Sequence, residues 1–195
     1  QLDLPERGFS FQTDGPLDMR MDQSRGETAA HWLSRAAETE ISDILWELGE
    51  ERFSRRIARK IVQQRTIKPI TSTTQLAEII SSVVHRRGRR LHPATKTFQA
   101  IRMHVNNEIQ ELEAALEVST KLIAPNGRIA IISFHSLEDR IVKRRFRNLV
   151  KDSSNRVEAT KFRVLTKKPS VVSQKELTTN PRSRSARLRV LECLG

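Results

Sequence analysis

The stretch "RIAIISFHSLEDRIVKRRF", residues 128–146, decides the fold because the spacing of apolar residues changes within it. Residues 128–134 are almost continuously apolar, which is typical of a strand buried on both faces of a parallel sheet. The run from Ser136 to Asp139, "SLED", has the character of a capping box, in which a serine hydroxyl accepts a hydrogen bond from the first helical turn. We therefore predict a strand followed directly by a helix, as in an α/β unit.

The residues before this unit predict a compact helical region, because apolar side chains recur there at helical spacing. Helices are expected at 27–37, at 41–48 with Gly49 as the stop, at about 50–65, after a cap at Ser72, Thr73 or Thr74, and from Pro93 through Val105 into 106–123.

The residues after it predict two further strands, at 161–165 and 185–192. In the second, Ala186, Leu188 and Val190 alternate with Arg187 and Arg189, which is typical of a half-buried strand with its arginines on the other face. Residues 151–160 and 166–183 are expected to be irregular. An open parallel sheet needs more strands than these, so we expect either a piece of a larger protein or an unconventional packing of residues 128–151. The start at Gln1 rather than Met also predicts the middle of a longer protein.

Composition predicts a protein that works on a polyanion. The chain of 195 residues has a formal charge of +12, and residues 52–90 hold eleven basic side chains against one acid, Glu78. Such a region favours contacts with nucleic-acid phosphates, and the alternative is a solvated basic face. A single cysteine, Cys193, excludes an internal disulfide, and no apolar run is long enough to span a membrane. We expect a reducing, cytoplasmic compartment.

Three aspartates, Asp14, Asp18 and Asp22, lie four residues apart in a segment that cannot be one helix. Gly15-Pro16 predicts a turn, because proline lacks an amide hydrogen and disfavours a helical residue before it. The ligand pattern of a calcium loop is absent from the segment, and no metal site is predicted. Either the aspartates form the turn and pair with Arg20 or Arg25, or they serve a functional site.

The junction at Phe134-His135-Ser136 is a second candidate site, because ligands of open α/β sheets bind outside the carboxyl ends of the strands. We expect Ser136 to cap the helix, and His135 either to face the crevice or to be structural. A serine hydrolase is disfavoured, since the sequence contains no G-x-S-x-G elbow.

Aromatic and polar side chains suggest contacts with a base. Trp32 either stacks a base or packs in the core, whereas Trp46 adjoins an apolar stripe and is predicted to be core. On the helix from Pro93, four polar residues share a face that either holds phosphates and a base edge or is solvated: Lys96, Gln99, Arg102 and Asn106.

Five blocks of the chain, taken in order, resemble the bacterial S-adenosylmethionine-dependent methyltransferases that modify the exocyclic amino group of a cytidine in small-subunit ribosomal RNA. The blocks are "QLDLPERGFSFQTDGPLDMRMD", "GEERFSRRIARKIVQQR", "HPATKTFQAIRMHVNNE", "GRIAIISFHSLEDRIVKRRF" and "NPRSRSARLRV". The resemblance covers the chain from Gln1 to its end and is weakest between 151 and 179.

The resemblance implies an α/β fold, part of a Rossmann-like class I methyltransferase sheet with an inserted all-helical domain. Residues 1–26 would form the active-site loop region, 27–104 the inserted RNA-binding domain, and 105–195 the carboxy-terminal half of the methyltransferase domain. The implied cofactor is S-adenosyl-L-methionine, and the implied partner is small-subunit ribosomal RNA or its assembling particle. The family's glycine-rich cofactor loop is not in this sequence, so Gln1 is the one cofactor contact carried over, and we expect the chain alone to be inactive.

The resemblance also implies roles for the candidate residues. Asp18 and His135 would be catalytic, with Asp18 accepting a proton or holding the cytosine amino group, and Trp32 would stack the target base. The substrate would also be contacted by Arg20, Ser136 and the polar face Lys96, Gln99, Arg102 and Asn106. The RNA backbone would be gripped by Arg55, Arg56, Arg59, Arg86, Arg87, Arg89 and Arg90. The rival interpretation is a non-catalytic basic RNA-binding or ribosome-assembly module, and a DNA-modifying relative is a third.

Overall fold

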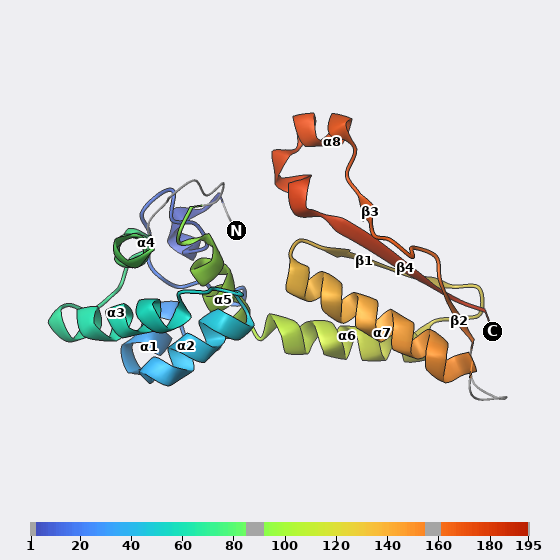
Figure 1. Ribbon diagram of the computed structural model, residues 1–195, viewed down its shortest axis with the longest axis horizontal. Coiled ribbons are helices and arrows are strands. Elements are labelled where there is room, and N and C mark those ends of the chain that lie inside the picture. The colour runs from blue at the N-terminus through green and yellow to red at the C-terminus, as the bar shows by residue number, and fades with distance from the viewer. Residues whose placement is uncertain (1–2, 85–91, 155–160, 195) are drawn as a thin grey trace. The chain divides into compact units, whose positions relative to one another are not determined.

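A computed structural model describes residues 3–84, 92–154 and 161–194 (Figure 1). The chain divides into two compact units, Gln1–Glu108 and Ile109–Gly195. The first unit is helical and the second is built from helices and a small sheet, so the α/β class is confirmed. No helix within the described ranges combines the length and the apolar character needed to cross a membrane.

The first unit contains the helices that the sequence predicts. They are a 3-10 turn η1 (Pro5–Arg7), α1 (Ala29–Arg35), α2 (Glu38–Glu47), α3 (Ser54–Ile67), α4 (Thr73–Val83) and α5 (Thr95–Val105). Local capping fixes two of the starts: the Thr28 side chain accepts a hydrogen bond from the amide of His31, and Ser72 forms a capping box with Gln75.

The long helical pattern from Pro93 is two helices rather than one. The second, α6, spans Glu108–Leu122, and the break falls at Asn106 and Asn107. Asn107 has a φ of 50°, a left-handed conformation that asparagine tolerates better than most residues and that ends a helix.

The core of the first unit lies between these helices and includes the fully buried side chains of Trp32, Ile57 and Ile80. The prediction that Trp46 is a core residue is wrong, because its side chain is 59% exposed on α2. The buried side of α2 is formed by Ile41 and Leu45, which lie one turn apart. Trp46 lies on the side of the helix that faces solvent.

The irregular segment before α1 packs onto the helical unit. The amide of Leu17 donates to the carbonyl of Thr71 at 2.9 Å, and the amide of Thr73 donates to the carbonyl of Gly15 at 2.9 Å. Leu17 is buried, so this segment contributes to the same core as the helices.

The second unit contains β1 (Arg128–Ser133), α7 (Ser136–Ser154), β2 (Phe162–Val164), β3 (Ser170–Val171), α8 (Gln174–Thr179), a 3-10 turn η2 (Pro181–Ser185) and β4 (Arg187–Cys193). The predicted strands are confirmed, and β3, α8 and η2 occupy the segment that was expected to be irregular. The sheet order is β1-β4-β2, with β3 also on β4, and every pair with β4 is antiparallel.

The prediction that β1 is buried on both faces of a parallel sheet is wrong for the described chain. Exposure alternates along β1, with Ile129 buried and Ile132 59% exposed, because α7 packs along one face of the strand (Figure 1). The Rossmann-like sheet, the inserted domain and the three predicted domain boundaries stay predictions.

Strand β4 also departs from its predicted pattern, because Arg189 is buried at 5% exposure. Its Nε donates to Asp139 Oδ1 at 2.7 Å and its Nη2 to Oδ2 at 3.0 Å. The hydrogen bonds from Arg189 hold the pKa of Asp139 below its ordinary value. A buried arginine is tolerated here because a carboxylate from the facing helix α7 pairs with it.

Candidate functional site

All three aspartates of the acidic segment have partners. Asp14 Oδ1 accepts from the amide of Thr74 at 3.2 Å and from its hydroxyl at 2.5 Å, while Asp22 Oδ2 lies 2.7 Å from Arg25 Nε. Asp18 pairs with Arg20, so the predicted pairing of Asp18 and Asp22 with nearby arginines is confirmed, and a role of Asp18 in a functional site stays a prediction. Asp14 and Asp22 are exposed, whereas Asp18 is buried.

Four donors surround the Asp18 carboxylate. Oδ1 accepts from the amide of Arg20 at 3.1 Å and from its Nε at 2.7 Å, and Oδ2 accepts from Arg20 Nη2 at 3.0 Å and Gln23 Nε2 at 3.3 Å. Burial of the carboxyl raises its pKa, but the hydrogen bonds and charge of Arg20 outweigh this and the pKa of Asp18 is lowered. The group is therefore an ionised hydrogen-bond acceptor and a weak base.

The backbone beside Asp18 is strained. Met19 is fully buried and has a φ of 64°, an uncommon conformation for a residue with a side chain. Gly8 approaches it closely, because a Cβ at position 8 would lie 2.7 Å from the amide nitrogen of Asp18. Strain of this kind persists only where the surroundings impose it, and it concentrates at functional sites.

Two distant side chains hold residues 18–21, which we call the Asp18 loop. Arg7 Nη2 donates to the carbonyls of Arg20 and Met21, both at 2.9 Å. The Asn106 side chain also forms two hydrogen bonds with the loop. Its Nδ2 donates to Met19 O at 2.7 Å, and its Oδ1 accepts from the amide of Met21 at 2.6 Å. The loop is thus fixed from both ends of the first unit's sequence, and sequence reasoning did not identify Arg7.

The other members of the predicted polar face are used differently. Lys96 Nζ donates to the carbonyl of Glu50 at 2.7 Å, and Arg102 forms a bidentate pair with Glu108 at 2.7 and 2.8 Å. Gln99 is half-buried on α5. Lys96, Arg102 and Asn106 therefore donate hydrogen bonds within the protein. Contact of the four side chains with a substrate stays a prediction.

The structure removes Trp32 from the base-stacking role. Its side chain is 1% exposed, its Nε1 donates to Glu40 Oε1 at 2.8 Å, and its ring centroid lies 4.5 Å from that of His104. A base cannot reach a ring face that core residues already cover. Burial lowers the pKa of the partner His104, which therefore packs as a neutral ring.

His135 and Ser136 lie at the start of α7 in the second unit. The helix begins at Ser136, and the cap is His135: its Nδ1 accepts from the amide of Glu138 at 3.4 Å, while Glu138 Oε2 accepts from the amide of Phe134 at 2.8 Å. The predicted cap at Ser136 is thus one residue too late. His135 Nε2 lies 3.1 Å from Glu138 Oε1, which supports the structural alternative for this histidine.

The basic face of the first unit lies on α3, where Arg55, Arg56 and Arg59 are exposed. The guanidinium of Arg56 lies 5.6 Å from the ring centroid of Phe53, and Arg59 lies 3.5 Å from Glu38. Gln1 and the four predicted arginines Arg86, Arg87, Arg89 and Arg90 lie outside the described residues.

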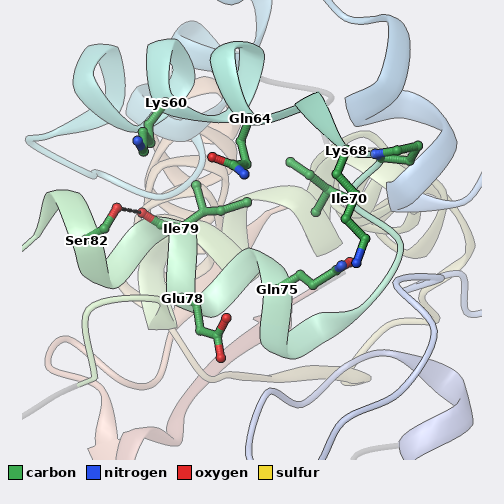
Figure 2. Close-up of a pocket in the computed structure, with 9 residues that line it drawn as sticks. Lys60, Gln64, Lys68, Ile70, Gln75, Glu78, Ile79 and Ser82 are labelled. Atoms are coloured by element: carbon green, nitrogen blue, oxygen red, sulfur yellow. Dashed lines mark hydrogen bonds between the residues drawn. The ribbon is translucent and has the colours of Figure 1, made fainter. Parts of the chain in front are cut away.

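A pocket of about 410 Å³ opens between α3 and α4. Figure 2 shows Lys60 and Gln64 projecting from α3 and Gln75 and Glu78 from α4. Within the described chain neither Lys60 nor Lys68, which also lines the pocket, forms an ion pair. The lining thus combines apolar side chains with two amides, two cations and the carboxylate of Glu78.

Comparison with known proteins decides the family. The model of the MraW methylase family matches residues 1–194, almost the whole chain. The chain belongs to the MraW methylase family. Within this MraW family member, the match covers both the Asp18 loop and the sheet of the second unit.

The chain is also similar to proteins named as ribosomal RNA methyltransferases. The chain is 52% identical over 203 residues to the ribosomal RNA small subunit methyltransferase H of Stenotrophomonas maltophilia strain K279a, covering 98% of this chain and 62% of that protein. It is 52% identical over 201 residues to the protein of that name from Xanthomonas euvesicatoria, covering 100% of this chain and 60% of the relative. The MraW family chain thus spans about three fifths of the length of these relatives.

Proposed function

We propose that this chain is part of an S-adenosylmethionine-dependent methyltransferase that methylates the exocyclic amino group of a cytidine in small-subunit ribosomal RNA. The family match and the names of the relatives at about half identity support a ribosomal RNA methyltransferase. The activity is assigned to the whole protein, since this chain covers 62% of the first relative. A cytoplasmic location follows from the proposed substrate.

The geometry of the Asp18 loop is the main support for the proposed chemistry. A cytosine amino group is a poor nucleophile because its lone pair is delocalised into the ring, so placement and hydrogen-bond acceptors must assist it. Asp18 supplies an ionised acceptor on a backbone fixed by Arg7 and Asn106. Carboxylates complement the amino group of cytosine.

We assign to Asp18 the orientation of the amino group rather than removal of its proton, since Arg20 keeps the carboxylate a weak base. Its longest hydrogen bond, 3.3 Å from Gln23 Nε2 to Oδ2, is the one that the cytosine amino group would replace. The bidentate pair with Arg20 would remain and keep the carboxylate in place.

The described residues do not fit the methyl donor on their own. The glycines beside the Asp18 loop pack against their own chain, since a Cβ at Gly8 would lie 2.3 Å from Pro16 O and one at Gly15 would lie 2.0 Å from Pro5 O. They leave no cradle for a cofactor at these positions. We assign the donor contacts to Gln1 and to parts of the whole protein beyond this chain, and we derive no step through the donor.

The RNA would be held by the first unit. Arg55, Arg56 and Arg59 on α3 would contact phosphates, and the pocket of Figure 2 would accept an unpaired nucleotide between Lys60 and Lys68. Such contacts give affinity and position without reading sequence.

The experiment compares Asp18→Asn with Asp22→Asn in the full-length protein, using transfer of a labelled methyl group to small-subunit ribosomal RNA. Each variant loses one carboxylate of the acidic segment, but Asp22 lies just after the Asp18 loop, is exposed and pairs with Arg25. Asp18→Asn should lower kcat about 100-fold while RNA affinity changes less than about 2-fold. Asp22→Asn should keep near wild-type values for both.

Equal loss in the two variants would remove Asp18 from the chemistry. The rival proposal, a non-catalytic RNA-binding or assembly module, is favoured by the basic face of α3 alone. It predicts tight RNA binding with no methyl transfer by the full-length wild-type protein, and that result would replace the proposal of an enzyme.

A further inference from the structure

The second unit contains a cationic pocket that the proposed reaction does not use. It has a volume of about 260 Å³ and lies between α7, β2 and β4. Four cations line it: Lys143, Arg147, Lys167 and Arg189. Its remaining lining is the hydroxyl of Thr166 and the apolar side chains of Phe146 and Val164, and no carboxylate is among the lining residues that the structure describes.

Arg189 supplies a donor to this pocket. Its side chain is 6% exposed, and its Nε and Nη2 donate to Asp139. None of the described residues accepts a hydrogen bond from Nη1. Nη1 is therefore free to donate to a ligand in the pocket that this side chain lines.

The other cations also lack counterions. Lys143 and Arg147 lie one turn apart on α7 and so project from the same side of the helix, and Lys167 follows β2. None of the three forms an ion pair within the described part of the chain. The acid nearest to Lys143 in sequence is Asp139, one helical turn earlier. Its carboxylate pairs with Arg187 and Arg189. The like charges repel one another, and a bound anion would relieve that repulsion.

Thr166 adds a directional donor. Its Oγ1 accepts from the amide of Val190 at 2.8 Å, which leaves the hydroxyl hydrogen to donate. Every polar group of the pocket can thus donate, and the ligand must be an anion rich in acceptors. Phosphate meets that description, and the volume of about 260 Å³ also accommodates the sugar attached to it.

We propose that this pocket binds a backbone phosphate of single-stranded RNA, with the adjoining sugar against the partly exposed side chain of Val164. The inference rests on the proposed function, which takes RNA as substrate. A polyanion is favoured over a small phosphate because the stripe of cations continues beyond the pocket: Lys151 follows Arg147 by one further turn of α7 and is exposed.

The test uses the full-length protein and a single-stranded oligoribonucleotide, whose binding is followed by fluorescence anisotropy over a series of salt concentrations. Lys143→Gln with Arg147→Gln removes two cations of the pocket. The matched control, Arg144→Gln with Lys175→Gln, removes one arginine and one lysine that are exposed in the same unit and do not line the pocket.

The pocket variant should reduce the slope of log affinity against log salt by about 0.7, the value for one phosphate contact with a single strand. The control should leave the slope within experimental error of wild type. Equal changes in both variants would show a diffuse basic surface without a phosphate site, and an unchanged slope in the pocket variant would exclude the contact. Both outcomes overturn the inference.

A second probe separates RNA from a small phosphorylated ligand. Inorganic phosphate, compared with chloride at equal ionic strength, should raise the midpoint of thermal unfolding of the wild type and the control but not of the pocket variant. If the pocket variant loses this response and keeps the wild-type RNA slope, the RNA assignment is wrong. Methyl transfer is measured on the same proteins, so a wild type that binds RNA through the pocket but transfers no methyl group refutes the proposed function and leaves the pocket standing.

Discussion

Replacing Asn106 with alanine should release the Asp18 loop while leaving its residues unchanged. The side chain joins α5 to the loop by two contacts, from Nδ2 to Met19 O at 2.7 Å and from Met21 N to Oδ1 at 2.6 Å. A third bond, from Nδ2 to Arg102 O at 2.8 Å, stays within the helix end. Alanine removes all three and adds no bulk.

The magnitude follows from these contacts. The two hydrogen bonds that reach the loop, at about 1 kcal/mol each, give a loss of about 2 kcal/mol. Relaxation of Met19 from its left-handed conformation, φ 64°, returns about 1 kcal/mol of strain. Arg7 still holds the carbonyls of Arg20 and Met21, and the exposed Met21 amide can turn to water. We expect the loop to open more easily by about 1 to 2 kcal/mol, a factor of about 5 to 30.

Amide hydrogen exchange measures this opening residue by residue. The amide of Met21 should exchange about 5 to 30 times faster in Asn106→Ala than in wild type. Gln99→Ala is the control, because it removes an amide side chain from the same helix that makes no hydrogen bond among the described residues. Unchanged exchange at Met21 in Asn106→Ala, or equal acceleration in both variants, would refute the idea that Asn106 holds the loop.

Two further predictions concern stability, measured as the free energy of unfolding in urea. Asp139 has a lowered pKa in the folded state, so its pairing with Arg189 stabilises the protein above the ordinary value of 3.8 and is lost as pH falls through the folded pKa. Asp139→Asn should cost about 3 kcal/mol at pH 7 and remove this acid-dependent part, and an unchanged pH profile would contradict the pairing. Trp32→Ala should lower the free energy of unfolding by about 3 to 5 kcal/mol, and Trp46→Ala should lower it by less than about 0.5 kcal/mol. The reverse order would show that Trp46, and not Trp32, is the core residue.

Local features of the fold could be predicted because their causes are local. Helix α4 begins where Ser72 and Gln75 form a capping box, and β2 falls on the apolar alternation of residues 161–165. The pairing of Asp18 with Arg20 involves residues two apart, and their opposite charges made it a natural alternative. Such interactions depend on neighbours in the chain, which the sequence displays directly.

Candidate site residues were harder to predict because their partners are distant. Nothing near Arg7 indicates that it donates to residues 20 and 21, and nothing near Asn106 indicates that it closes the loop from the other end. The two tryptophans show the same limit: the apolar stripe beside Trp46 predicted a core residue and the alternatives for Trp32 stayed open, but packing buries Trp32 against His104 and leaves Trp46 exposed.

Periodicity, capping and composition act over a few residues, so the amino-acid sequence sufficed to predict the helices of the first unit, the strand at 128–133, the basic charge and the family resemblance. Tertiary contacts were needed to establish that β1 pairs antiparallel with β4, that Arg189 is buried on Asp139, and that the Asp18 loop is held from both sides. The physical reason is that burial and hydrogen-bond partners are set by segments that approach one another only after folding, and the side chains that join them carry no local signal of their partners.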